Sequence, residues 1–466
     1  MTLEGLVIAK TLGSNSSYWL LSPEGKYFLI KQFAVQTDYT VGKAIAVEGS
    51  EAEERGQRAI EADSVKPAGK EIEKRVKAWV EKNSVPHEAQ LLVDNAVTRK
   101  LEPFFTRAAH EIAESVLMLT PIVVRFHDDA DGAASALELQ RAVFSFAAEK
   151  KVPFRKSFFS ANADSYFYEE KFLRADLEWA QGFPEKKPLL VLADHASNEE
   201  SIPALEQARS AFKTIVIDHH PPAEDFSKHV GLFVSAFAFD RNVEKSDYNA
   251  GYLAFEVARR FAPLNQLENL ELLAFASMHA DHSRFAPRER GVEEALALEF
   301  LSSGKIDLQE VYEDFFDARK REFAFKKATV RLKQMRDAAR KTTRVVEAGK
   351  FLIQVIKLSS FVKKSVFPQK AKCVNVLHDD GEARYGKPLV TIGFTEDAAS
   401  FRVSQSAHAL GFKANDFIAS LQTEMPHAIE SGGGHDRASA MRFKKEFSAR
   451  VFEGTVEELK RVLQTL

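Results

Sequence analysis

The segment RFHDDADG (residues 125–132) places imidazole and carboxylate side chains at a spacing that could bind a metal ion. It matches the calcium-loop pattern D-x-[DN]-x-[DN]-G-x5-E except that histidine replaces the first aspartate; the pattern positions are His127, Asp129, Asp131, Gly132 and Glu138. A calcium hand needs a helix before its loop, whereas the apolar run IVVRF predicts a strand. Mixed nitrogen and oxygen ligands instead favour manganese, zinc or iron. The alternative is an acidic turn that only caps the following helix.

Two other apolar runs end in side chains of the same kinds. VLADHASN presents Asp194, and TIVIDHHPP presents Asp218, His219 and His220. Buried strands that end in acid and imidazole groups are hard to explain by packing, because buried polar groups need partners. Asp281 follows the mostly apolar helical pattern LELLAFASM, where a lone acid more often caps a helix. Convergence of these segments would form a metal site.

A glycine-rich segment, SGGGHDRAS (residues 431–439), is the third chemical motif. Its three consecutive glycines let the backbone approach a ligand closely. His435 and Arg437 beside them could face a phosphate. A glycine turn is the more common explanation of such a run, so this motif is weak when taken alone.

The elements that must position these motifs alternate between strand and helix from Pro121 onward. IVVRF, PLLVLAD and TIVIDHH read as buried strands, and AASALELQRAVFSFAAEKK has helical periodicity. This alternation predicts an α/β fold with a mainly parallel sheet, whose ligand site lies at the carboxyl ends of the strands. We expect residues 116–318 to form this catalytic domain.

The segments before it predict a small β module and a linker. Residues 1–50 contain short alternating runs separated by GSNSS and PEGK, as in a barrel of the oligonucleotide-binding or S1 type. Trp19, Tyr27 and Phe28 on these strands could stack on bases or pack in a core. Residues 51–115, rich in Ala, Glu, Lys and Arg, predict a helical linker.

The segments after it predict a basic connecting helix at 319–345 and a smaller α/β domain at 346–466. Residues 319–344 contain eleven Lys or Arg residues against two acidic ones. Its basic residues near one helical face are Lys333, Arg336, Arg340 and Arg344. This face could be simply solvated, or it could run beside a phosphate backbone.

The composition of the 466 residues limits the class of protein. A hydrophobic content of 45% supplies sizeable cores, and a net charge of −3 means that any basic surface must be local. One cysteine, Cys373, excludes an intramolecular disulfide and a cysteine metal cluster, so a metal must use His and carboxylates. The sequence shows neither a signal peptide nor a stretch of about 18 apolar residues. We expect a cytoplasmic protein.

Taken in their order along the chain, the motifs resemble those of the DHH phosphoesterase family. Within that family they resemble the archaeal RecJ-like exonuclease branch, which includes a helicase-associated nuclease. HDDADG, LADHASN, IDHHPP, DYNAGYLAFEVARR, HADHSR and SGGGHDRAS follow the order of the family's motifs over residues 120–450. The N-terminal β module lies outside the family core. The full ordered set is specific, whereas each motif alone is modest evidence.

The resemblance implies two Mn²⁺ ions, with Mg²⁺ as the alternative, bridged by one aspartate. The ligands of the first ion would be His127, Asp129 and Asp194, and those of the second would be Asp131, Asp194, His219 and Asp281. Asp218 would orient a ligating histidine, and His220 would contact the scissile phosphate. His195 and His279 stand where relatives more often have apolar or small residues, and we expect them to fill space.

The resemblance also implies a substrate-binding set in the C-terminal domain. Its members would be Arg402, Gly432, Gly433, Gly434 and His435, which would bind the terminal nucleotide or its phosphate. The implied activity is a manganese-dependent exonuclease that releases nucleoside monophosphates from single-stranded DNA or RNA, in repair or replication. Alternatives are hydrolysis of short oligonucleotides or cyclic dinucleotides, an inorganic pyrophosphatase, and a scaffold for a helicase or replisome protein. Polarity and the choice of DNA or RNA stay open.

Overall fold

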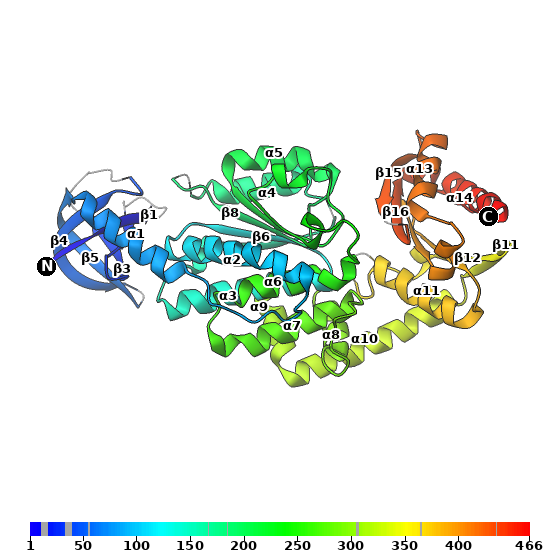
Figure 1. Ribbon diagram of the computed structural model, residues 1–466, viewed down its shortest axis with the longest axis horizontal. Helices are drawn as coiled ribbons and strands as arrows, with labels where there is room; N and C mark the ends of the chain where they lie inside the picture. The colour runs from blue at the N-terminus through cyan, green and yellow to red at the C-terminus, as the bar shows by residue number, and fades with distance from the viewer. Residues whose placement is uncertain are drawn as a thin grey trace. The chain divides into compact units, whose positions relative to one another are not determined.

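A computed structural model describes residues 1–10, 17–32, 40–54, 56–165, 167–183, 185–303, 307–363, 366–434 and 436–466. It confirms the predicted fold class, with a parallel-sheet α/β domain, a smaller α/β domain and an N-terminal β module (Figure 1). The chain forms two compact units, the first within Met1–Arg321 and the second mainly Glu322–Leu466. Among the described residues, no helix is both long and apolar enough to cross a bilayer.

The N-terminal module is a closed five-stranded barrel with strand order β1-β2-β3-β5-β4. The strands are β1 (Thr2–Lys10), β2 (Ser17–Leu21), β3 (Tyr27–Gln32), β4 (Ala44–Glu54) and β5 (Gln57–Pro67). Residues 51–54 and 57–67, whose composition predicts a helical linker, therefore belong to β4 and β5 instead. Exposed Glu61 and Asp63 alternate with buried Ile60 and Ala62, and this two-residue period outweighs the helix-favouring composition.

Two helices, α1 (Lys70–Ser84) and α2 (Ala96–Leu117), follow the barrel. The buried Tyr27 hydroxyl donates a hydrogen bond of 2.7 Å to the Leu117 carbonyl at the end of α2. Phe28 is buried in the barrel core, and Trp19 is half-buried against the larger core of the first unit. Packing therefore explains these aromatic residues, and the base-stacking hypothesis for Tyr27 and Phe28 is wrong.

The central sheet of the first unit is entirely parallel, with strand order β10-β9-β8-β6-β7. Its strands are β6 (Ile122–His127), β7 (Phe158–Ala163), β8 (Leu189–Ala193), β9 (Lys213–Ile217) and β10 (Leu232–Val234). Successive residues of a strand face opposite sides. Val124 and Phe126 thus enter one core, while Val123 enters the other.

Helices cover both faces of this sheet, as an α/β fold requires (Figure 1). One face packs against α2, α3 (Ala130–Glu149), α6 (Ala250–Ala258) and α7 (Leu267–Ala280), and the other packs against α4 (Glu170–Ala180) and α5 (Ile202–Ala211). Shorter helices, α8 (Val292–Leu301) and α9 (Leu308–Phe316), pack beside α7 and α3. The helices cover the two faces, which leaves the edge at the carboxyl ends of the strands for a site.

The second unit contains a six-stranded mixed sheet with order β11-β12-β13-β14-β16-β15. Its strands are β11 (Arg344–Ala348), β12 (Phe351–Lys357), β13 (Leu389–Phe394), β14 (Ala398–Val403), β15 (Ile429–Gly434) and β16 (Ala438–Phe443). Its helices are α11 (Lys370–Tyr385), α12 (Gln405–Ala409), α13 (Ala414–Glu424) and α14 (Ser448–Thr465), and α10 (Ala318–Ala339) precedes the sheet. Helix α11 packs against β13 and β14, while α13 packs against β15 and β16.

Candidate metal centre

The predicted metal ligands of the first unit meet at one edge of the parallel sheet. His127 ends β6, Asp194 directly follows β8, and His219 follows β9. Because these strands are neighbours and parallel, their carboxyl ends lie side by side. Asp281 joins them from the end of α7. Within each of three groups, ligand atoms lie within 4.8 Å of one another; the groups are His127, Asp129 and Asp194; Asp131, His219 and Asp281; and Asp194, His219 and His220.

The side chain of Asp194 is shared between these groups. Its Oδ2 atom lies 3.5 Å from His127 Nδ1, which is itself 2.8 Å from Asp129 Oδ2. Its Oδ1 atom lies 3.2 Å from His219 Nε2. His219 Nε2 is also 3.4 Å from Asp281 Oδ2. One carboxylate thus turns an oxygen toward each of two groups of donors, as a carboxylate that bridges two cations must do.

Asp194 is held in a costly environment. It is 1% exposed, and its φ of +55° lies in the left-handed region that non-glycine residues rarely adopt. Its Oδ1 atom is buried and meets no well-aligned hydrogen-bond donor in the described part of the chain, although the His219 Nε2 atom is 3.2 Å away. A buried carboxylate oxygen that lacks a well-aligned donor is unfavourable unless positive charge neutralises it. This observation fits a bound metal ion.

The charges of the cluster support the same conclusion. Burial, together with the nearby charges of Asp129 and Asp131, raises the pKa of Asp194 to about 8. Burial also raises the pKa of Asp281 to about 7, although His219 opposes this change. Burial alone would lower the pKa of His219, but Asp281 and the other carboxylates outweigh burial and raise it to about 10. The carboxylates thus need positive charge, which divalent cations would supply in exchange for protons.

Asp131 is oriented by the start of α6. Its carboxylate accepts hydrogen bonds from the Ala250 amide at 2.8 Å, the Gly251 amide at 2.6 Å and Asn249 Nδ2 at 2.7 Å. Only a glycine fits at 251, because a Cβ atom there would lie 2.1 Å from Ser277 Oγ. These donors fix the carboxylate beside His219, whose Nε2 atom is 3.5 Å away.

The residues just before α6 hold two other candidate ligands. His219 Nδ1 lies 3.1 Å from the Lys245 carbonyl, which holds the ring with Nε2 toward the cluster. Asp247 is fully buried and accepts hydrogen bonds from the Arg284 amide at 2.9 Å and from Arg284 Nε at 2.8 Å. Arg284 lies in the loop that begins at Asp281. Residues 245–251 therefore support three candidate ligands, and the sequence analysis did not identify this role.

Asp218 orients His220 rather than a predicted metal ligand. Its carboxylate contacts His220 Nδ1 at 2.9 Å and accepts hydrogen bonds from the His220 and Ser197 amides at 3.1 Å. The ring of His220 is thereby fixed beside Asp194, with 3.6 Å between His220 Nδ1 and Asp194 Oδ1. Burial lowers the pKa of His220 to about 4, so the ring is neutral near pH 7.

The first loop also decides between the alternatives raised by its sequence. Asp129 caps α3 by accepting a hydrogen bond of 3.0 Å from the Gly132 amide, and it also lies in a ligand group. Glu138 is buried within α3, outside all three groups, and burial raises its pKa well above the usual range. The turn therefore both caps the helix and faces the cluster. The calcium-loop interpretation is wrong, because Glu138, the last ligand position of that pattern, lies outside the cluster.

His195 and His279 fill space, as predicted, and belong to none of the three groups. His195 is fully buried between the rings of Tyr168 and Phe172, with centroid distances of 6.0 and 5.8 Å. His279 Nε2 lies 2.7 Å from the Pro287 carbonyl, in the loop after α7.

The predicted substrate-binding residues lie together in the second unit, except that His435 lies outside the described residues. Gly432, Gly433 and Gly434 end β15, and Arg402 lies on β14, which β16 separates from β15. A Cβ atom at Gly432 would be 2.5 Å from Ile418 Cγ2, and Gly434 has a φ of +134°, so packing and backbone conformation require these two glycines. Gly433 faces open space and leaves its backbone accessible.

A polar cluster lies beneath α11 around Arg402. The Arg402 guanidinium donates to Asn375 Oδ1, and the neighbouring His378 Nδ1 lies 2.8 Å from Thr391 Oγ1. His378 is buried. Burial, followed by the positive charges of Arg402 and Arg437, lowers the pKa of His378 to about 4.

This lowered pKa makes the stability of the protein sensitive to acid. In the unfolded chain, His378 binds a proton below the usual histidine pKa of about 6.5. In the folded protein it binds this proton only below about pH 4, so the free energy of unfolding falls as the pH falls between these values. Between about pH 7 and pH 5, we expect a His378→Asn variant to lose ~2 kcal/mol less stability in urea unfolding than the unchanged protein. Exposed His427→Asn is the control. Equal losses in all three proteins would contradict this prediction.

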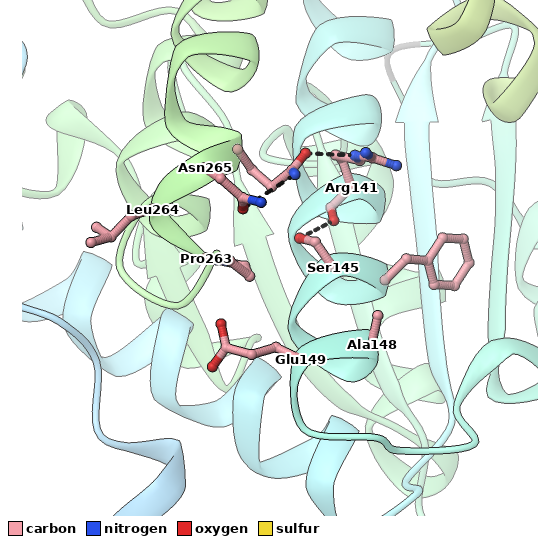
Figure 2. Close-up of a pocket in the computed structure, with 9 residues that line it drawn as sticks. Arg141, Ser145, Ala148, Glu149, Pro263, Leu264 and Asn265 are labelled. Atoms are coloured by element: carbon pink, nitrogen blue, oxygen red, sulfur yellow. Dashed lines mark hydrogen bonds between the residues drawn. The ribbon is translucent and has the colours of Figure 1, made fainter.

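A cavity lies away from these residues. It has a volume of about 710 Å³ and lies between α3 and the turn before α7 (Figure 2). Its lining residues are Arg141, Phe144, Ser145, Ala148, Glu149, Pro263, Leu264, Asn265 and Gln266. None of them belongs to a ligand group, and Arg141 is already bound to Gln266 Oε1 at 2.9 Å. The ligand cluster is therefore the candidate active site.

Comparison with known proteins identifies the domain that carries the cluster. Residues 121–261 match the sequence profile described as "DHH family, N-terminal domain". "Uncharacterized protein MJ1198" from Methanocaldococcus jannaschii is 26% identical over 445 residues, which cover 84% of this chain and 58% of that protein. The chain thus spans less than two thirds of the length of this relative. These findings confirm the resemblance to the DHH family.

One solved structure supports the fold. A structure titled "Member of s1p family of ribosomal proteins PF0399 DHH domain" has a TM-score of 0.75 and 22% sequence identity, covering 84% of this chain and 98% of that one. RecJ from Thermus thermophilus, in complex with Mn²⁺, has a TM-score of 0.48 and 14% identity, covering 82% of this chain and 56% of that one. The first of these structures covers 84% of this chain, so the similarity of fold includes residues of both units.

Proposed function

Because residues 121–261 form a DHH family N-terminal domain, we propose that this chain is a metal-dependent phosphodiesterase with two divalent cations, Mn²⁺ or Mg²⁺. The observation that carries the proposal is the division of Asp194 between two groups of donors. His127 and Asp129 would complete one site, and His219 and Asp281 would complete the other with Asp131. This donor set of carboxylates and imidazoles suits manganese.

The chain's own residues would prepare the reaction around these ions. A bound pair of cations supplies a water-derived nucleophile near neutral pH and positive charge beside the phosphate. His220 is neutral, and its one ring proton lies on Nδ1 and faces the Asp218 carboxylate. Donation from its Nε2 atom to a phosphate oxygen would therefore require uptake of a second proton. The Lys245 carbonyl and the amides that start α6 keep His219 and Asp131 from rotating away. Catalysis would therefore depend on preorganised side chains.

We propose single-stranded DNA or RNA as the substrate, with release of nucleoside monophosphates from one end. The basic helix α10 supports a long polyanionic substrate, and Arg402 with the glycines of β15 is the proposed site for the terminal nucleotide. A role in repair or replication, a helicase or replisome partner and a cytoplasmic location rest on the family resemblance alone. All six predicted ligand positions carry side chains that can bind a metal ion, which argues against a scaffold without activity.

Substrate length separates this proposal from its nearest rival, hydrolysis of very short oligonucleotides or cyclic dinucleotides. With Mn²⁺, we expect kcat/KM for an end-labelled strand of about 30 nucleotides to exceed that for a dinucleotide by at least ~10-fold, because a long strand adds backbone contacts. Gel analysis of DNA and RNA strands, each blocked at one terminus, would also give polarity. A preference for the dinucleotide would establish the rival instead.

A further inference from the structure

Helix α10 presents an exposed face that combines aromatic, aliphatic and basic side chains. Its inner face is formed by its buried residues, which are Ala324, Ala328, Leu332, Met335 and Ala339. Phe323, Lys327 and Val330 follow one another at helical spacing on an exposed flank of the helix. Phe323 is 59% exposed and Val330 is 53% exposed, so both apolar side chains are accessible to a partner. This face has no partner among the described residues of the chain.

The cations of α10 beyond its first turn divide into paired and unpaired sets. Lys326 pairs with Glu322 at 2.5 Å, Arg336 with Asp380 at 2.7 Å, and Arg340, just past the helix, with Asp337 at 3.5 Å. Within the described ranges, three exposed cations of this part of α10 form no ion pair; they are Lys327, Arg331 and Lys333. These three are the cations that remain available to an anionic partner.

The unpaired basic residues of α10 therefore differ from those that the sequence analysis placed on its basic face. Of the four residues proposed for that face, Arg336 and Arg340 are bound to carboxylates, and Arg344 begins β11. Only Lys333 remains. One of the available cations, Lys327, instead lies next to the exposed aromatic ring, with its Nζ atom 5.1 Å from the centroid of Phe323.

We propose that this surface, called the α10 track and consisting of Phe323, Lys327, Val330, Arg331 and Lys333, binds single-stranded nucleic acid. The cations would contact phosphates and the Phe323 ring would stack on a base, which is the combination that sequence-independent single-strand sites use. The proposal rests on the proposed function, and it assigns part of the substrate contact to residues outside the catalytic cluster. Isolated apolar side chains among cations suit a strand of bases and phosphates better than a protein partner, which needs a continuous apolar patch.

Binding without catalysis tests the track directly. Fluorescence anisotropy with a labelled strand of about 30 nucleotides, in EDTA and at several salt concentrations, reports affinity and the number of phosphates contacted. In a Lys327→Gln, Arg331→Gln, Lys333→Gln variant, we expect the slope of log affinity against log salt to shrink by about 2, since each single-strand contact contributes ~0.7. The matched control replaces exposed Lys70, Lys74 and Lys82 of α1 by glutamine and should keep the slope of the unchanged protein.

A second variant separates stacking from charge. Phe323→Ala should weaken binding by ~5-fold to 100-fold while the salt slope stays constant, because the lost contact carries no charge. An unchanged slope in the triple variant, or an equal change in the α1 control, would overturn the track. If the triple variant lost binding to anionic phospholipid vesicles but still bound the strand normally, the surface would be a membrane-binding site, and the α10 track would be wrong.

The two proposals fail in different ways. If Mn²⁺ supports no cleavage of any strand or dinucleotide but the triple variant still loses binding, the proposed function is wrong and the track stands. If cleavage occurs and the triple variant binds strands normally, the track is wrong and the proposed function stands.

Discussion

Replacing Asp194 by asparagine is expected to lower phosphodiester hydrolysis by at least ~10³-fold, because cation-derived stabilisation of the transition state is worth several kcal/mol. The Asp194 carboxylate faces both donor groups, so its loss would disturb both ions together. Asparagine is the informative substitution since it tolerates the left-handed backbone at this position better than alanine does. Cleavage of an end-labelled strand in Mn²⁺, followed on denaturing gels, measures the loss.

The same substitution should not harm the metal-free fold. Asp194→Asn removes a buried carboxylate whose pKa burial and its neighbours raise to about 8, so we expect an equal or higher Tm in EDTA. Exposed Asp240→Asn serves as the control for activity and for Tm. Retained hydrolysis by Asp194→Asn would refute the two-cation assignment, whereas lost hydrolysis with a strongly lowered Tm would mean only that the fold had failed.

The strand ends of the catalytic domain were predictable from sequence because local pattern and chemistry agree there. The apolar runs before His127, Asp194 and His219 are short, and parallel topology brings their carboxyl ends together whatever the details of the helices. The position of Asp281 was not predictable in this way. It reaches the cluster from the end of a helix, and the motif order of the family, rather than periodicity, identified it.

Contacts between residues distant in the sequence account for most of what was missed. Arg125 interrupts an apolar strand, and its buried partner Asp176 lies on α4, at 2.5 Å. Nothing local to either residue specifies this pair. Residues 51–67 read as helical because their composition of Ala, Glu and Arg outweighs a weak alternation of apolar and polar residues in the sequence. The pairing of cations on α10 was likewise invisible, because Arg336 meets Asp380 of α11 only after folding.

The second large effect is expected at Asp247, which touches no candidate ligand directly. Its carboxylate holds Arg284 by the amide and the guanidinium, and Arg284 lies three residues after Asp281. Asp247→Asn would weaken this hold and free the Asp281 loop. Residues that support metal ligands typically change metal affinity or activity by ~10-fold to 100-fold when replaced. We therefore expect the Mn²⁺ concentration for half-maximal activity to rise by about this factor.

The chain offers a control with the same chemistry in another place. Asp176 is also a buried carboxylate held by an arginine, but it belongs to none of the ligand groups. Asp176→Asn should lower the free energy of unfolding and leave the Mn²⁺ dependence unchanged, whereas excess Mn²⁺ should restore most of the activity of Asp247→Asn. A shift no larger in Asp247→Asn than in Asp176→Asn would show that Asp247 only stabilises the fold. A selective shift would show instead that the cluster depends on the hold that Asp247 exerts, through Arg284, on the loop that begins at Asp281.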